Sequence, residues 1–261
     1  MQDFKIDLSG RVALVTGGGR GIGATISLAL AQAGADVAIN YNNSQLEANK
    51  IRDKIEMIGQ RSLAIKANVG DTAQCKILVQ KTVEVFNRVD ILVGNAGISQ
   101  PHQIVDTPDE EWERVMNVNA RATFALAREL LPGMIQRKFG RFITISSGVA
   151  VYGIGGASGV TYAASKAALI ALTKGIAHEG APYVTANAIL PGPTNRQLAE
   201  ERTKPIQIQE NEPVNWLGIP TPISRKGIPE DIAHTVVFFS SDASEYITGQ
   251  SLHVSGGLFM P

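Results

Sequence analysis

The sequence predicts an α/β protein with one doubly wound parallel β-sheet and helices on both of its faces. Short apolar runs alternate with longer amphipathic stretches along the 261 residues, which is the pattern of successive strand–helix units. The runs at 12–15 and 91–93 are apolar at every position, as strands buried on both faces are. No internal repeat or low-complexity linker divides the chain, so residues 1–261 are predicted to form a single domain.

Seven segments are predicted to be strands and six to be helices. The predicted strands are residues 11–16, 36–41, 62–66, 91–94, 140–146, 184–190 and 251–254. The predicted helices are residues 21–32, 45–58, 72–86, 108–136, 160–179 and 230–240. Single helices between successive strands imply right-handed crossovers, and therefore strands that run parallel.

Residues 195–224 interrupt this alternation. The segment is rich in proline, contains an isolated Trp216 and is longer than an ordinary connection. Because it follows a strand end in an α/β sheet, it is predicted to be a substrate lid. A surface excursion without function is the alternative.

Composition excludes several classes of function. The chain has 24 basic and 24 acidic residues, so nothing indicates a nucleic-acid partner. No apolar run approaches the roughly 18 residues of a membrane span, and the first residues do not resemble a signal peptide. A single cysteine, Cys75, fits a reducing compartment. The four histidines have no ligand spacing. We expect a cytoplasmic protein with no membrane partner and no metal site.

A glycine-rich turn follows the first predicted strand and opens the first predicted helix. Gly17, Gly21 and Gly23 are spaced Gly-x-x-x-Gly-x-Gly. Glycines let the backbone approach a pyrophosphate closely, and the helix N-terminus supplies free N–H groups. Strand before and helix after therefore favour a dinucleotide-binding Rossmann fold over a merely flexible turn.

The charge at the end of the second strand indicates which dinucleotide. NAD sites place an acidic side chain there to bind the ribose 2′-hydroxyl, but no acid lies between Asp36 and Glu47. Arg20 stands inside the glycine turn, where its guanidinium could grip a phosphate. A solvated turn residue is the alternative for Arg20. NADP(H) is the predicted cofactor.

Tyr162 and Lys166 stand four residues apart in a run of small and apolar residues. Positions i and i+4 of a helix share a face. A nearby cation lowers the pKa of a phenol from its usual value near ~10, which a tyrosine needs in order to act as a general acid/base. Taken alone, the pair could equally be a partly buried tyrosine beside a solvated lysine.

The glycine turn and the Tyr162–Lys166 pair together resemble the short-chain dehydrogenase/reductase family, over nearly the whole chain. Further motifs in the expected order carry the resemblance: Asn95-Ala-Gly97, Asn119, Ser147, Pro191-Gly192, and the C-terminal stretches 224–232 and 246–254. The resemblance implies four catalytic residues, Asn119, Ser147, Tyr162 and Lys166. The residues expected to bind the cofactor are Gly17, Gly19, Arg20, Gly21, Ile22, Gly23, Asn40, Tyr41, Asn42, Ser44, Asn68, Val69, Asn95, Ala96, Gly97, Tyr162, Lys166, Pro191, Gly192 and Thr194.

The resemblance also implies a role for each catalytic residue. Tyr162 would protonate a ketone oxygen as hydride arrives, while Ser147 would hold that oxygen. Lys166 would lower the Tyr162 pKa and bind the nicotinamide ribose. Asn119 would anchor a water that links Lys166 to solvent. Two alternatives stay open: Ser146 could be the active serine, and Asn119 could only bend its helix.

The chain departs from the family pattern at several positions. Gly94 replaces an asparagine, Asn68 and Ser255 each replace an aspartate, and Arg196 stands where a threonine is common. The spacing between Ser147 and Tyr162 is also long, so the loop at 148–161 is enlarged.

The expected substrate pocket is mostly small and apolar. Its predicted wall consists of Ile98, Ser99, Val149, Val151, Tyr152, Pro193 and parts of 194–216. Such a wall favours a neutral ketone or secondary alcohol, so we predict an NADPH-dependent oxidoreductase for small-molecule substrates. The alternative is a 3-oxoacyl-carrier-protein reductase, and a non-catalytic dinucleotide sensor is a remote one.

A carrier protein is acidic and would need basic residues at the mouth of the site. Arg137, Lys138 and Arg141 are the candidates, but the turn at 182–183 lacks an expected arginine. By resemblance, the protein is also predicted to be a homotetramer, with the apolar ending 256–261 buried against a neighbouring subunit.

Overall fold

The computed structural model describes residues 6–99, 102–152, 159–195, 197 and 221–260, and it contains one seven-stranded sheet. All neighbouring strands are parallel, in the order β3-β2-β1-β4-β5-β6-β7. The strands are β1 (Val12–Val15), β2 (Asp36–Tyr41), β3 (Ser62–Lys66), β4 (Ile91–Gly94), β5 (Gly140–Ile145), β6 (Val184–Pro191) and β7 (Ser251–Val254). The strand order reverses direction between β1 and β4, and the crevice at such a point is where α/β proteins bind ligands.

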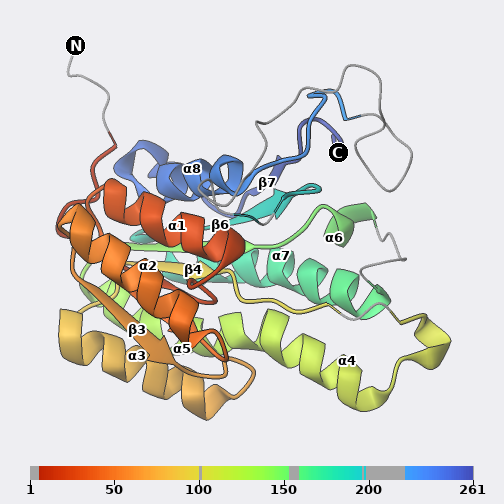
Figure 1. Cartoon of the computed structure of the whole chain (residues 1–261), viewed down its shortest axis with the longest axis horizontal. Helices are drawn as coiled ribbons and strands as arrows, with labels where there is room; N and C mark the ends of the chain where they lie inside the picture. The colour runs from red at the N-terminus through yellow and green to blue at the C-terminus, as the bar shows by residue number, and fades with distance from the viewer. Residues whose placement is uncertain (1–5, 100–101, 153–158, 196, 198–220, 261) are drawn as a thin grey trace.

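Helices cover both faces of this sheet (Figure 1). One face carries α1 (Gly21–Gln32), α2 (Gln45–Ile58) and α8 (Pro229–Ser240), with α1 between the other two. The other face carries α3 (Thr72–Phe86), α5 (Ala122–Gln136) and α7 (Val160–Gly180). A separate apolar core lies on each side of the sheet. The predicted doubly wound α/β fold is therefore confirmed.

The predicted long helix at 108–136 is divided into three parts. Helix α4 (Asp109–Met116) leads into a π-helical turn, η2 (Asn117–Arg121), which leads into α5. A π turn fits one extra residue into the helix and is common at functional sites. Here it turns Asn119 and Ala120 into the protein interior. Polar–apolar periodicity could not predict this insertion, because the pattern continues through it.

Three short elements were not predicted from the sequence: η1 (Ile104–Asp106), α6 (Val149–Tyr152) and η4 (Asp242–Ser244). Helix α6 begins the enlarged loop after β5, so that loop is partly helical. Most of the predicted lid, including Arg196 and Trp216, lies outside the described residues. None of the described helices is long and apolar enough to cross a membrane.

The basic residues considered for a carrier protein lie at the wrong edge of the sheet. Arg137 and Lys138 precede β5, and Arg141 is its second residue. All three are therefore at the amino end of that strand, whereas the glycine turn lies at the carboxyl ends. Arg141 is only 4% exposed and is paired with Asp242. The interpretation that these residues line the mouth of the site was wrong.

Candidate active site

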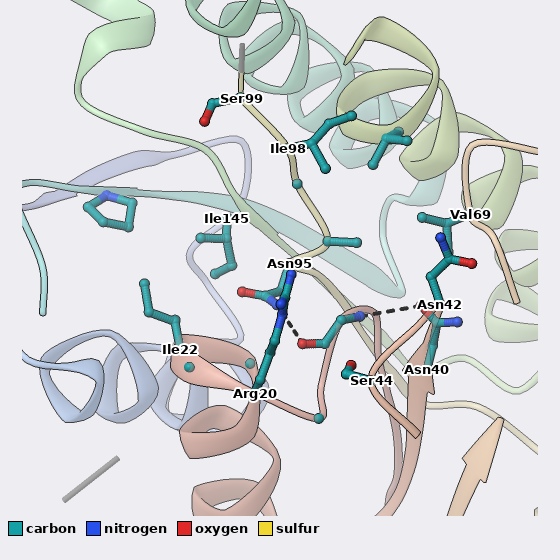
Figure 2. Close-up of a pocket in the computed structure, with 18 of the residues that line it drawn as sticks. Arg20, Ile22, Asn40, Asn42, Ser44, Val69, Asn95, Ile98, Ser99 and Ile145 are labelled. Carbon is teal, nitrogen blue, oxygen red and sulfur yellow. Dashed lines mark hydrogen bonds between the residues drawn. The ribbon is translucent and has the colours of Figure 1, made fainter. Parts of the chain in front are cut away.

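A cleft of about 2040 Å³ runs along the carboxyl edge of the sheet. It extends from α2, over the glycine turn after β1, to the end of β5 and the start of α7. Figure 2 shows side chains from several of these segments converging on it. Parallel strands bring their carboxyl ends to one edge, so loops distant in the sequence meet here.

The glycine turn is packed so closely that it has no room for a side chain at Gly23. A Cβ on Gly23 would lie 2.2 Å from the carbonyl oxygen of Gly17, and Gly17 itself has a φ of +61°. Arg20 is exposed at the N-cap position of α1 and lines the cleft. The turn therefore presents backbone and one guanidinium to the cleft, and this arrangement suits a phosphate-bearing ligand.

Asn40 fastens the glycine turn to the neighbouring strand. Its Oδ1 accepts from the Gly17 N–H at 3.3 Å (Figure 2), and its Nδ2 donates to the Ala67 carbonyl at 2.9 Å. The side chain is only 2% exposed. Although Asn40 lines the cleft as predicted, its amide is committed to holding the cradle in shape.

Asn95 makes the corresponding connection from β4. Its Nδ2 donates to the carbonyl oxygens of Thr16 and Gly17 at 2.9 and 3.2 Å. The Thr16 hydroxyl in turn accepts from the backbone N–H groups of Asn95 and Ala96, both at 3.0 Å. Neutral hydrogen bonds from both sides therefore fix the glycine turn between β2 and β4.

Tyr162 and Lys166 lie in the first turns of α7 and both line the cleft. The Lys166 side chain is 3% exposed, and its Nζ donates to the Ile145 carbonyl at 2.7 Å. That nitrogen is 5.7 Å from the centroid of the Tyr162 ring. A Cβ on Gly97 would come within 3.2 Å of it, so this glycine leaves the space that the ammonium occupies.

The two serines after β5 point in different directions. Ser146 is 3% exposed, and its hydroxyl donates to the Lys166 carbonyl at 2.7 Å. The hydroxyl of the half-buried Ser147 accepts a long bond from the Val149 N–H at 3.4 Å, so its own proton can be given to a ligand. This geometry favours Ser147 over Ser146 as the residue that contacts substrate.

Asn119 lies behind the cleft and does not line it. Its Oδ1 accepts from the Ile98 N–H at 2.8 Å, and its Nδ2 donates to the Ile98 carbonyl and the Ser165 hydroxyl, both at 2.9 Å. The Ser165 hydroxyl donates to the Tyr162 carbonyl at 2.7 Å. The amide therefore ties the segment after β4 to α7 through both of its Nδ2 protons and its Oδ1.

The cleft contains nearly all of the residues predicted from the sequence. Every predicted cofactor contact lines it, as do Ser147, Ile98, Ser99, Val149 and Pro193. Val151 and Tyr152, predicted as wall residues, do not. Within the described residues, no cluster of potential metal ligands occurs.

Several lining residues were missed from the sequence. Glu47, Lys50 and Lys54 form one face of α2 beside the glycine turn, and their helical spacing could have revealed them. Arg114 and Lys226 also line the cleft without a local signal. Phe259 enters it from the C-terminal tail, which had been assigned to a neighbouring subunit instead.

A family model described as enoyl-(acyl carrier protein) reductase matches residues 17–259. A 3-oxoacyl-[acyl-carrier-protein] reductase from Staphylococcus aureus is 36% identical over 249 residues, covering 95% of this chain and 98% of that protein. The chain belongs to the short-chain dehydrogenase/reductase family.

Two further proteins are similar to this chain over nearly their whole length. Versicolorin reductase from Emericella nidulans is 38% identical over 262 residues, with 97% of each chain covered. A blue fluorescent protein from a metagenomic library, solved in complex with NADPH, is 34% identical with a TM-score of 0.84 and covers 97% of this chain and 100% of its own. The resemblance inferred from the motifs is confirmed, and the protein is an oxidoreductase of this family.

Proposed function

We propose that this short-chain reductase uses NADP(H) to interconvert a neutral ketone and a secondary alcohol. The observation that carries the proposal is the position of Lys166. Its buried ammonium is 5.7 Å from the Tyr162 ring centroid, in the cleft that Ser147 and the glycine turn also line. One cleft thus holds a proton donor, a cation, a hydroxyl and a phosphate cradle.

The residues at one end of the cleft fit a dinucleotide with a 2′-phosphate. The glycine turn has no room for a side chain at Gly23, so backbone N–H groups would face the pyrophosphate. Arg20, Lys50 and Lys54 outnumber Glu47 around the turn and α2. The similar protein solved with NADPH supports the same cofactor here. When bound, the nicotinamide supplies or takes up the hydride.

The residues at the other end would manage the substrate oxygen. The Tyr162 hydroxyl donates a proton to the oxygen during reduction, and the Tyr162 phenolate takes that proton up during oxidation. The Ser147 hydroxyl donates a hydrogen bond to the same oxygen, where negative charge develops. The Lys166 ammonium stabilises the phenolate that remains on Tyr162. Asn119 positions Ile98 and α7 so that these groups stay aligned.

A 3-oxoacyl-carrier-protein reductase is the second candidate, because the Staphylococcus aureus relative has that activity in its name. The basic residues first considered for docking a carrier lie at the opposite edge of the sheet. Arg114 and Lys226 do line the cleft and could contact a carrier instead. Because the residues first considered for docking do not reach the site, a neutral small-molecule ketone remains our first choice.

One assay separates these candidates. NADPH oxidation is measured side by side with β-ketoacyl thioesters, ketoses and cyclic ketones. Turnover of the cyclic ketones supports the proposal, whereas turnover confined to thioesters supports the carrier enzyme. NADPH binding without oxidation of any substrate would indicate a non-catalytic sensor. A ratio of kcat/KM for NADPH over NADH below one would reject the NADP assignment.

Arg20→Ala tests the cofactor assignment by itself. Removing the guanidinium should weaken NADPH binding about tenfold or more, as the loss of a charge-assisted hydrogen bond does. NADH lacks the 2′-phosphate, so its KM should change little. Equal losses for the two cofactors would place Arg20 away from that phosphate.

We also propose that the protein is a homotetramer, as the family resemblance implies. Exposed apolar side chains on α4 and α5, Trp112 and Phe124, offer surface for a second copy. The C-terminal tail is less available than expected, because Phe259 is buried within its own chain and, among residues 256–260, only Met260 is exposed. A monomer mass by light scattering would contradict the proposal.

A further inference from the structure

The C-terminal tail folds back towards the cleft instead of leaving the molecule. Gly256 and Gly257 have φ values of +63° and +83°, a conformation that glycine adopts without strain. The Ser255 hydroxyl accepts from the Phe259 N–H at 3.2 Å, and the Leu258 N–H donates to the Ser255 carbonyl at 3.2 Å. This closed turn, residues 255–259, directs Phe259 back into the protein.

The Phe259 ring belongs to a small aromatic cluster. It stacks on Tyr152 with ring centroids 4.7 Å apart and 23° between the planes, and His253 lies 6.1 Å away. Burial lowers the pKa of His253, which favours the neutral form of this imidazole. Phe259 is only 6% exposed and is one of the residues that line the cleft.

Gly148 shows how closely this ring approaches the proposed catalytic serine. A Cβ on Gly148 would lie 2.2 Å from Cδ2 and Cε2 of Phe259. The φ of Gly148 is outside the left-handed range, so glycine is needed there for space and not for conformation. Because Gly148 follows Ser147 directly, the Phe259 ring lies beside the residue that would hold the substrate carbonyl.

We propose that Phe259 is a specificity-determining residue that forms an aromatic end wall of the substrate pocket and selects flat apolar ketones. The inference rests on the proposed function and names its substrate class: an aryl or cyclic ketone over a linear one. An aromatic wall gains from stacking or edge contact with a flat ring, and a flexible chain can use neither. Tyr152 stacks on the Phe259 ring, and the Ser255 hydroxyl binds the Phe259 N–H.

The first test compares acetophenone with 2-heptanone in the presence of NADPH. In the wild type the ratio of kcat/KM should favour acetophenone. Phe259→Leu keeps an apolar wall without a ring and should reduce that ratio about fivefold to tenfold, while the Kd for NADPH stays unchanged. An unchanged ratio in Phe259→Leu would overturn the proposal.

A second test uses the contact between Gly148 and the ring. Gly148→Ala should lower kcat/KM for acetophenone by about tenfold to a hundredfold, because the added methyl displaces the ring. In a Phe259→Ala background the same change should cost less than about twofold, since contacting residues are not additive. Equal losses in both backgrounds would show that the ring does not occupy this space, and would overturn the proposal.

A third measurement does not depend on turnover. Titration calorimetry of acetophenone into protein saturated with NADP⁺ compares wild type with Phe259→Leu. Weaker binding in Phe259→Leu by about fivefold supports the end wall, and equal affinity rejects it. If the wild type reduces none of the ketones, the proposed function fails, and this affinity comparison still decides the role of Phe259.

Discussion

The two edges of the sheet use polar residues in opposite ways. At the carboxyl edge, the glycine turn is held by the neutral amides of Asn40 and Asn95, and the Lys166 ammonium donates to a backbone carbonyl. At the amino edge, acidic and basic side chains form ion pairs with one another. Asp90 accepts from Arg88 at 2.6 Å and from the Val12 N–H at 3.0 Å.

The amino edge continues this pattern along β5. Arg141 pairs with Asp242 at 3.3 Å, and its guanidinium lies 4.3 Å from the Phe139 ring centroid. Arg11 covers the same ring at 3.5 Å. Burial lowers the pKa of Arg141, and the charge of Asp242 opposes that shift. Matched charges of this kind hold strand ends together, whereas the Lys166 ammonium at the carboxyl edge lies in the cleft, 5.7 Å from the Tyr162 ring centroid. The comparison predicts that substitutions at the carboxyl edge mainly lower activity, and that substitutions at the amino edge mainly lower the free energy of unfolding.

The largest difference between the effect on activity and the effect on stability is expected from Tyr162→Phe at the carboxyl edge. Loss of the proton donor should lower kcat by about 10²–10⁴, while the free energy of unfolding changes by less than about 1 kcal/mol. Steady-state kinetics, urea denaturation and NADPH fluorescence titration measure the three quantities. Retained turnover would remove Tyr162 from the mechanism. A large stability loss would remove the contrast between the edges.

Asp90→Ala at the amino edge should show the opposite behaviour. It leaves the Val12 N–H and the Arg88 guanidinium without a carboxylate, and it should cost about 3 kcal/mol of unfolding free energy. The kcat/KM of the folded enzyme should stay within about twofold. The matched control is Asp53→Ala, which removes an exposed pair with Arg52 at 2.6 Å and should cost less than about 0.5 kcal/mol. Equal losses in both variants would contradict the assignment.

The sequence predicted the fold and most of the cleft because their causes are local. Apolar runs, a glycine turn and an i, i+4 pair are each visible within a few residues. The π turn at Asn119 was not visible, because an inserted residue leaves helical periodicity nearly unchanged. Structure was also needed to see that the Asn119 amide serves as a clamp, because Ile98 is 21 positions away.

The sequence was least informative about where distant residues lie in the folded protein. Arg137, Lys138 and Arg141 looked suitable for an acidic partner, but the sequence does not state which edge of a sheet a basic cluster occupies. An apolar tail predicts burial without naming the surface that buries it: burial of 256–261 against a neighbouring subunit stays a prediction, whereas Phe259 is already buried within its own chain. Gly148, more than a hundred residues earlier, is what makes room for that ring. Such pairs are complementary only once the chain is folded.

Gly23→Ala tests whether the carboxyl edge depends on close backbone packing. The added methyl would lie 2.2 Å from the Gly17 carbonyl and 2.6 Å from the Asn95 amide, so the turn must open at a cost of about 1–3 kcal/mol. We expect weaker NADPH binding in fluorescence titration, together with a modest loss of stability. The matched control is Gly175→Ala in α7, where nothing lies within 4 Å. It should gain about 0.5–1 kcal/mol, and similar losses in both variants would contradict the packing argument.

The smallest effect is expected at Cys75, which is fully buried in α3 with its Sγ 3.2 Å from the carbonyl of Val69, a residue that lines the cleft. Burial, followed by the charge of Asp71, raises the pKa of this thiol from 9.0 to about 11. At pH 8 the native protein should therefore react with a thiol reagent only as fast as it opens. Stoichiometric labelling in urea is the control. Immediate labelling of the native protein would show that this part of the carboxyl edge is open.

The same thiol links stability to pH. Because the pKa of Cys75 is higher in the folded protein, the unfolded chain loses the thiol proton at a lower pH. The contribution of this thiol to the free energy of unfolding is therefore complete below about pH 9.0 and is lost as the pH rises towards about 11. Urea denaturation at pH 8 and pH 10.5 measures the loss, and Cys75→Ala should show a shallower one because it has no thiol to ionise. Parallel curves for the two proteins would mean that the thiol reaches solvent in the folded state. In that case this part of the carboxyl edge would be less tightly packed than the charged edge opposite it.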